Sequence, residues 1–333
     1  MKQRLFSWSI LGGLLLSATL AMAAPSDITW TDDVSINPVI LNQTLGDKRA
    51  YYGCVIYDKT AQKWRAWYDA SSGKDLGYAE STDVDGKTWT NYQLCKGFSS
   101  SQQSKAFVVQ TGPSQFRMWY TADQRQGGYY ISSCVSSDGV NWTQDDWVTG
   151  IAEPDPLQYG PTERIAVFRL DNGSFVAYVR CEEPEIAAVA DFLGTKRLYR
   201  YTSSDGKAWT WAGDTGVSSI EGMDGIEFSS VVKHHDKDGV WYAWGCGANS
   251  SGPIQSFVST DDGLTFQLDE NPVSGVGEIG TQTYNVDRNY HPSVTYMGQG
   301  RWIMYRTVAE PKATARAEGT EPLETPVSAW SLF

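Results

Sequence analysis

The repeated stretch KWRAWYDASSGKDLGYAESTDVDGKTWT, at Lys63–Thr90, decides the fold. It begins with an aromatic-rich strand (Lys63–Ala70), continues with a second strand (Leu76–Ser81), and ends in an Asp-Gly turn followed by an aromatic residue. Asp-Gly pairs favour the tight turns of β-hairpins. The turn aromatic residues of the four copies are Trp89, Trp142, Trp209 and Phe266. Their spacings of 53, 67 and 57 residues show that one unit recurs along the chain.

Each copy also has a short apolar strand before the aromatic one. These strands are Gly53–Tyr57, Ala106–Val109, Ile165–Phe168 and Ser229–Val232. Four short strands in a recurring unit are typical of a β-propeller blade, and no stretch shows sustained helical periodicity. The 14 Trp, 18 Tyr and 32 Gly residues agree, because aromatic residues suit strands and glycine suits tight turns. The sequence therefore predicts an all-β fold.

A fifth unit is incomplete at the C-terminal end of the chain. It begins with Pro292–Tyr296 and Trp302–Arg306, and we expect its third strand at Val327–Phe333, after a long surface loop at Ala309–Thr325. The missing fourth strand matches Ile28–Asp33, near the N-terminus. Closing the last blade with both ends of the chain removes the open edge that a linear array of sheets would leave. The prediction is a five-bladed β-propeller.

The first 23 residues have the pattern of a secretory signal peptide. Lys2 and Arg4 precede the apolar run Ile10–Leu20, and Ala21-Met22-Ala23 is a small-x-small cleavage site. An uncleaved anchor is the alternative, which the absence of a later stop-transfer pattern disfavours. We expect a secreted or periplasmic protein whose single domain spans residues 24–333.

Charge and composition exclude several classes of partner. Removing the two basic residues of the leader from 27 leaves 25 against 39 acidic residues, and nucleic acid and anionic membranes both require a basic face. We therefore expect no nucleic-acid partner, no membrane insertion, and a monomer. Three histidines and five cysteines match no zinc pattern. Disulfide bonds and buried free thiols stay open as alternatives.

Loops that enter the inner strand of each blade crowd one rim of a propeller, so residues just before those strands converge. The aligned residues are Tyr52, Lys105, Arg164, Phe228 and His291. The residues before them are Tyr51, Ser104, Glu163, Glu227 and Tyr290, with Asp47, Asp224, Asp287 and Arg288 further out. A polar, aromatic rim of this kind predicts a carbohydrate pocket, with ordinary loop charges as the alternative. We interpret the repeated Ser-x-Asp-Gly turns, by contrast, as structural.

The chain resembles the five-bladed propeller glycosidases of the arabinanase, β-xylosidase and fructosidase type. The resemblance rests on Trp67–Trp89, Ile36–Ile40 and His291–Tyr296. It implies a nucleophile or base from blade one, an Asp from blade two that tunes a pKa, and an acid Glu from blade three. This sequence departs from that plan, since Tyr52 occupies the blade-one position and the region of Lys105 lacks the blade-two Asp.

Only Glu163 matches the third acid of that family in placement. We predict a glycoside hydrolase in which Glu163 and Glu227 act as acid and base, because hydrolysis needs two carboxyl groups. Asp287 is the reserve base. The predicted substrate-binding residues are Tyr52, Lys105, Arg164, Asp224, Arg288 and His291.

The resemblance places His291 where some members of that family hold a channel calcium, directly or through water; the alternative is a histidine that is hydrogen-bonded in the channel wall, and no cofactor is required. Two alternatives to hydrolysis remain. One is a non-catalytic, lectin-like propeller that binds poly- or oligosaccharide. The other is a lyase with Tyr52 or His291 as base and Arg164 neutralising the carboxylate of an acidic sugar. The mix of Lys, Arg, Tyr and His side chains at the rim fits an acidic sugar better than a neutral sugar.

Overall fold

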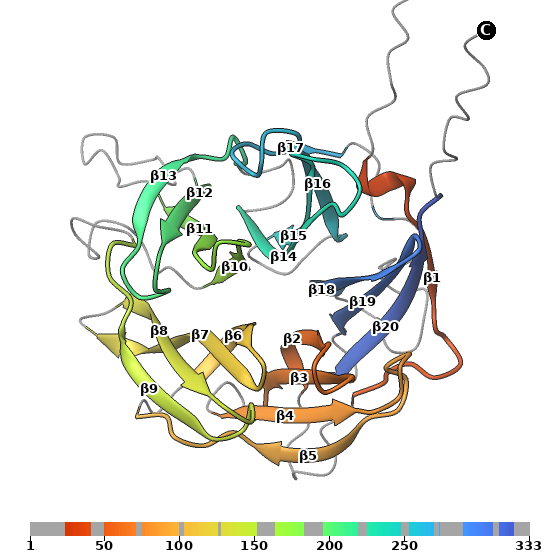
Figure 1. The fold of residues 1–333 in the computed structure, drawn as a ribbon, viewed down its shortest axis with the longest axis horizontal. Coiled ribbons are helices and arrows are strands. Elements are labelled where there is room, and N and C mark those ends of the chain that lie inside the picture. The colour runs from red at the N-terminus through yellow and green to blue at the C-terminus, as the bar shows by residue number, and fades with distance from the viewer. Residues whose placement is uncertain are drawn as a thin grey trace, which may run out of the picture.

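A computed structural model describes residues 24–40, 50–70, 75–99, 103–125, 128–151, 164–182, 196–218, 225–247, 253–269, 273, 289–308 and 313–322. These residues form five four-stranded antiparallel sheets arranged as a ring (Figure 1). The first strand of each sheet lies at the centre of the ring and the fourth at its outside. The chain is therefore a five-bladed β-propeller, as predicted. Among the residues described, no helix is long and apolar enough to cross a membrane.

The strands follow the predicted repeat closely. Blade 1 is β2 (Tyr51–Asp58), β3 (Lys63–Asp69), β4 (Leu76–Ser81) and β5 (Thr90–Leu94). Blade 2 is β6 (Gln103–Gly112), β7 (Gln115–Arg125), β8 (Gly128–Ser136) and β9 (Trp142–Trp147). Blade 3 is β10 (Ile165–Arg169), β11 (Phe175–Glu182), β12 (Lys196–Ser203) and β13 (Thr210–Asp214). Blade 4 is β14 (Ile226–Lys233), β15 (Trp241–Gly247), β16 (Gln255–Ser259) and β17 (Gln267–Leu268). Blade 5 is β18 (Asn289–Gly298), β19 (Arg301–Val308), β20 (Ala313–Thr320) and β1 (Thr29–Asp32), which follows the 3₁₀ turn η1 (Pro25–Asp27).

Blade 5 is closed by an N-terminal strand, as predicted, but its third strand is not the one expected. The strand β20 pairs with β1 from Thr29↔Thr320 to Asp32↔Ala317, so the prediction of a surface loop across this region was wrong. The expected strand Val327–Phe333 lies outside the described residues. Apolar patterning missed β20 because its buried hydrophobic side chains are only alanines, at 313, 315 and 317, and the polar Thr314 and Arg316, also buried, lie between them.

Buried arginines hold this closure together. Arg306, whose side chain is fully buried, lies 2.6 Å from Asp32. Arg316, equally buried, pairs with Asp33 and with Glu318. A buried charge is costly unless it is paired, so these contacts fix the N-terminal strand against the last blade.

The Ser-x-Asp-Gly turns are structural, as interpreted from the sequence. In blade 2, Asp138 accepts hydrogen bonds from the backbone N–H groups of residues 140 and 141. The carbonyl of Gly139 accepts one from the indole of Trp142 at 3.1 Å and one from Trp67 of blade 1 at 2.7 Å. The turn therefore ties one blade to the next.

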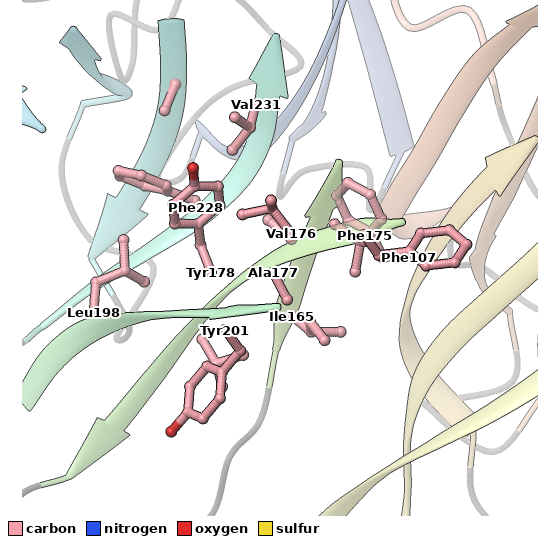
Figure 2. Packing of buried hydrophobic residues seen from close by; sticks show 14 of the residues in the cluster. Phe107, Ile165, Phe175, Val176, Ala177, Tyr178, Leu198, Tyr201, Phe228 and Val231 are labelled. Carbon is pink, nitrogen blue, oxygen red and sulfur yellow. The ribbon is translucent and has the colours of Figure 1, made fainter. Parts of the chain in front are cut away.

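The same inter-blade bond recurs around the ring. Each donor is the large aromatic residue of a second strand, and each acceptor is the turn glycine of the following blade: Trp67 to Gly139, Trp119 to Gly206, Tyr178 to Gly263, and Tyr305 to Gly86. Apolar side chains fill the space between blades, as Figure 2 shows for blades 2 to 4 around Phe175, Tyr178 and Phe228. Four cysteines of the described part of the chain are free thiols: Cys54, Cys95, Cys134 and Cys246.

Candidate functional site

The inner strands of blades 1, 2 and 5 each begin with a β-bulge. The bulges contain Tyr52, Lys105 and His291, whose φ angles are 51°, 52° and 52°. Bulky residues seldom adopt this left-handed conformation, which costs about 1–3 kcal/mol and is retained mostly at functional sites. A bulge re-aims a side chain out of the regular alternation of its strand. Three blades thus use one device to direct a side chain out of the sheet.

These side chains meet, as the alignment of the inner strands predicted. The ring of Tyr52 lies 4.5 Å from the ring of His291, edge to face. The ammonium of Lys105 lies 5.5 Å above the ring of Tyr52. Tyr51 and Tyr290, the residues preceding two of them, pack with ring centres 5.1 Å apart. The result is an aromatic cluster with one cation beside it.

Arg164 enters the cluster from blade 3. It is 3% exposed, and its guanidinium donates a hydrogen bond to Nδ1 of His291. A guanidinium has no acceptor, so Nδ1 carries the lone pair and the neutral ring holds its proton on Nε2. Burial lowers the pKa of His291 well below 6.5, and the charges of Arg164 and Lys105 lower it further. His291 is therefore a neutral acceptor that orients Arg164.

Glu227, one of the two predicted catalytic carboxylates, belongs to the same site. It is 2% exposed, and its Oε1 lies 3.3 Å from the guanidinium of Arg180 in the neighbouring blade. Neither carboxylate oxygen has a hydrogen-bond partner among the described residues. Burial of an ionisable group without hydrogen bonds costs free energy, and the ion pair with Arg180 offsets that cost only in part.

The pKa values show that these groups share one environment. Burial raises the pKa of the Tyr52 phenol well above 10, and the neighbouring Tyr51 and the carboxylates of Asp69 and Glu227 raise it further. Burial also raises the pKa of the Cys246 thiol to about 11, and Glu227 adds to that rise. Tyr52 is therefore a neutral phenol at physiological pH, suited to contact rather than to proton abstraction.

The second strands contribute a ring of buried polar side chains that the sequence interpretation missed. They lie at equivalent positions, two residues after the large aromatic residue: Asp69, Thr121, Arg180, Cys246 and Thr307. The signal was present in the repeats, which read WYD, WYT, YVR, WGC and YRT at this point. Asp69 is 3% exposed and accepts the backbone N–H of Lys105 at 2.9 Å, so it links blades 1 and 2 at the site.

Other predicted residues are absent from this cluster or fall outside the described part of the chain. Phe228 occupies the aligned position in blade 4, yet its ring packs among Tyr178, Phe257 and Phe266 in the core. It lacks the left-handed φ of its counterparts, and the irregularity of its strand falls after it, between Phe228 and Ser230. Phe228 therefore still pairs with Gly245, and its side chain lies in the blade interface. The residues outside the described part are Glu163, Asp224, Asp287 and Arg288, together with Asp47.

The described surroundings of His291 do not fit calcium. Nδ1 lies 3.4 Å from Oγ of Ser229 and 3.7 Å from Sγ of Cys246, and it faces the positive Arg164. Calcium requires several oxygen ligands, and a neighbouring guanidinium repels a cation. Within the described ranges, no group of three or more His, Cys, Asp or Glu side chains is placed to hold a metal ion.

A cavity of about 280 Å³ lies further along the same inner strands. Its walls are mainly apolar and include Val55, Val108, Val167, Val231 and Val294. Cys54 and Ser229 also line it, so it continues the central channel beyond the polar cluster. The channel thus has a polar, aromatic end where the inner strands begin and an apolar end where they finish.

Comparison with known proteins gives a clear result at the level of the fold. No family model matches the sequence, and no curated protein matches it. Solved structures do match along most of the chain. They include a thermostable family-43 glycoside hydrolase with a TM-score of 0.59 and 14% identity, covering 86% of this chain and 91% of that one. The fold is that of the five-bladed glycoside hydrolases.

Two further structures support this result. One comes from the GH130 family, described as mannoside phosphorylases that include glycoside hydrolases targeting β-1,2 mannosidic linkages in Candida mannan. It has a TM-score of 0.62 and 14% identity, covering 89% of this chain and 97% of that one. The other is a β-xylosidase, with a TM-score of 0.56 and 11% identity over 84% of this chain and 94% of that one. The resemblance to propeller glycosidases expected from the sequence is confirmed as a likeness of fold.

Proposed function

We propose that this chain is a carbohydrate-active propeller, and specifically a glycoside hydrolase that acts on a poly- or oligosaccharide at the polar end of its channel. The structural neighbours that support this are glycoside hydrolases. The partly exposed phenol ring of Tyr52 offers an apolar face for a sugar ring, and the buried rings of Tyr51 and Tyr290 support it from beneath. We further propose that the protein acts outside the cytoplasm, given the signal-peptide pattern of its first 23 residues.

The observation that carries the proposal is the state of Glu227. Its carboxylate is buried in the cluster. Among the described residues, Arg180 is its ion-pair partner, and neither oxygen accepts a hydrogen bond, so both can receive one from a ligand. A substrate hydroxyl would donate such a hydrogen bond to Glu227. A glycosidic oxygen would instead accept a proton from the protonated Glu227. Glu227 is therefore one of the two carboxyl groups that glycoside hydrolysis requires.

The second carboxyl group is, in our proposal, Glu163, which directly precedes Arg164 in blade 3. Asp287 remains the reserve. Asp69 is a further candidate that the described structure adds, because it is buried and, like Glu227, raises the pKa of Tyr52. Substitution of each carboxylate by its amide distinguishes them, since loss of a catalytic acid or base lowers turnover by orders of magnitude.

A lyase and a lectin-like propeller are the two alternative functions, and each has less support from the site than a hydrolase. A lyase needs a base that accepts a proton readily, but burial keeps Tyr52 protonated and Arg164 occupies Nδ1 of His291. A lectin-like propeller is favoured by one observation, namely that Tyr52 stands where the resembled family holds its blade-one Asp. That alternative is tested directly by turnover.

The test is a screen of plant, fungal and bacterial polysaccharides for release of reducing ends, with binding measured in parallel by affinity electrophoresis. The proposal expects at least one polysaccharide that is both bound and cleaved. Binding without release of new reducing ends, across the whole panel, would make the protein a glycan-binding propeller. Unsaturated, ultraviolet-absorbing products would instead indicate a lyase.

A further inference from the structure

The structure describes five buried arginines, and four of them are paired with carboxylates. Arg65 contacts Asp58 at 2.9 Å, Arg180 contacts Glu227, Arg306 contacts Asp32, and Arg316 contacts Asp33 and Glu318. Arg164, which is 3% exposed, has no carboxylate within ion-pair distance among the described residues. Its direct partner is the neutral ring of His291, and its Nε–H has no partner in the described part of the chain.

An unpaired guanidinium in the interior of a protein is costly. Desolvation of a charge is offset only by an opposite charge with good hydrogen-bond geometry, and four of the five sites above meet that condition. His291 does not offset the charge, because its imidazole is neutral and supplies one lone pair. Arg164 is thus prepared for an anion that the chain itself does not supply from its described residues.

The position of Arg164 places this charge in the candidate carbohydrate site. Its field lowers the pKa of Tyr52, Cys54 and Cys246, although burial keeps each of them raised overall. These three residues come from blades 1 and 4, while Arg164 comes from blade 3, so the guanidinium lies near the axis of the ring. His291 links Tyr52 to Arg164, because its ring lies 4.5 Å from that of Tyr52 and its Nδ1 accepts the hydrogen bond from Arg164.

We propose that Arg164 and the ring of Tyr52 form a subsite for an oxyanion carried by the ligand, with His291 fixing the orientation of the guanidinium. Guanidinium matches planar carboxylates and tetrahedral oxyanions through parallel N–H donors. The ligand class is an acidic sugar whose carboxylate reaches Arg164; a free oxyanion such as inorganic phosphate has the same chemistry. That the oxyanion is carried by a sugar rests on the proposed function; that Arg164 binds an oxyanion does not.

Isothermal titration calorimetry tests the subsite without any need for turnover. The probes are D-galacturonate and D-glucuronate, the uncharged methyl ester of galacturonate, D-galactose, inorganic phosphate and sulfate. The proteins are the parent, Arg164→Gln, Arg164→Lys and a control, Arg197→Gln. Arg197 lies in the same blade, pairs with Asp214 at 2.7 Å, and has a side chain that is 40% exposed, so the control removes the same charge away from the channel.

We expect the parent to bind a uronate at least about ten-fold more tightly than its methyl ester, since each charge-assisted pair contributes about 1.5–3 kcal/mol. Arg164→Gln should lose that preference, Arg164→Lys should keep a reduced one, and Arg197→Gln should match the parent. Binding of phosphate or sulfate with the same dependence on Arg164, and no preference for uronate, assigns the subsite to a free oxyanion.

Two results would overturn the proposal. The first is that neither a uronate nor an inorganic oxyanion binds the parent. The second is that Arg164→Gln, shown to be folded by its near-ultraviolet circular dichroism, binds them as the parent does. If Arg164→Gln does not fold, Arg164→Lys decides, because a point charge without the planar fork must weaken the uronate preference. Anion binding in a protein that cleaves no polysaccharide would leave the subsite intact and refute the hydrolase.

Discussion

The Oε1 atom of Glu227 in blade 4 lies 3.3 Å from a terminal guanidinium nitrogen of Arg180 in blade 3. Both side chains are almost fully buried; Glu227 lies on β14, the inner strand of blade 4, and Arg180 on β11, the second strand of blade 3. The pair therefore couples two functions: it sets the position of the proposed catalytic carboxylate and it joins two neighbouring blades. The two functions can be separated by substitution.

Substitution of Arg180 by Met should be strongly destabilising, because it leaves Glu227 buried without a counter-charge. Removal of one partner of a buried pair costs about 3–5 kcal/mol. The double variant Arg180→Met/Glu227→Gln should recover part of that loss, since the remaining side chain is neutral. Urea denaturation of the parent, both single variants and the double variant measures the coupling. Additive losses would show that the two side chains do not interact.

The turn glycines should resist substitution where they receive the aromatic donor of the previous blade. A Cβ on Gly139 would lie 3.0 Å from the indole ring of Trp67, and φ there is +85°. Gly298 has a similar φ of +96° but no atom within 4 Å of such a Cβ. Gly139→Ala should thus lose about 1–3 kcal/mol more stability than Gly298→Ala, because overpacking adds to the shared backbone strain. Equal losses in thermal denaturation would contradict the inter-blade contact.

Closure of the ring should depend far more on the buried ion pair of Arg306 and Asp32 than on the partly exposed ion pair of Arg301 and Asp85. Asp32→Ala leaves the fully buried Arg306 unpaired and should cost about 3–5 kcal/mol. Asp85→Ala removes one of the two carboxylates that pair with Arg301 and leaves Glu318 in place; because both side chains of the Arg301–Asp85 pair are about one-third exposed, the change should cost at most about 1 kcal/mol. The midpoints of urea unfolding test this ranking. A reversed order would mean that β1 does not close blade 5 as described.

Stability should fall in acid partly through Glu321. Burial alone would raise its pKa, but hydrogen bonds from His234 and Trp302 outweigh burial and hold the pKa below 4.5. A carboxyl group with a depressed folded pKa stabilises the fold above its unfolded pKa, and this contribution is lost as pH falls through the folded value. Glu321→Gln should therefore unfold with a flatter pH dependence than the parent below about pH 4.5. Parallel pH profiles of the melting temperature would refute this role.

The sequence predicted blades 1 to 4 well because each contains an Asp-Gly turn at a fixed place after an aromatic strand. It failed at β20, where alanines at 315 and 317 fill the interior and give no apolar signal. At the candidate site, the equivalent strand positions of three residues explain why the alignment predicted that they lie together. Counting back from each inner strand placed Tyr52, Lys105 and His291 together, because all three blades share the same bulge.

Two features of the site could not be predicted by that counting. The alignment gave Phe228 the same position, but the irregularity of its strand falls one residue later, after the Phe228↔Gly245 pair, and the Phe228 ring packs in the core. Arg180 and Asp69 were missed because the site was predicted only from the residues that precede the inner strands, and these two lie near the ends of second strands. Their polar side chains lie at the channel end of those strands, where the regular alternation brings them to the cluster.

The central claim is that Glu227 takes part in glycoside hydrolysis, and the most direct test measures turnover and binding separately in Glu227→Gln. The matched control is Glu80→Gln, which removes a carboxylate that pairs with Lys63 in blade 1, away from the cluster. On a polysaccharide that the parent cleaves, we expect Glu227→Gln to lose at least about a hundred-fold in kcat while its Kd for that polysaccharide changes little. Turnover within about three-fold of the parent, in a folded Glu227→Gln protein, would contradict the assignment.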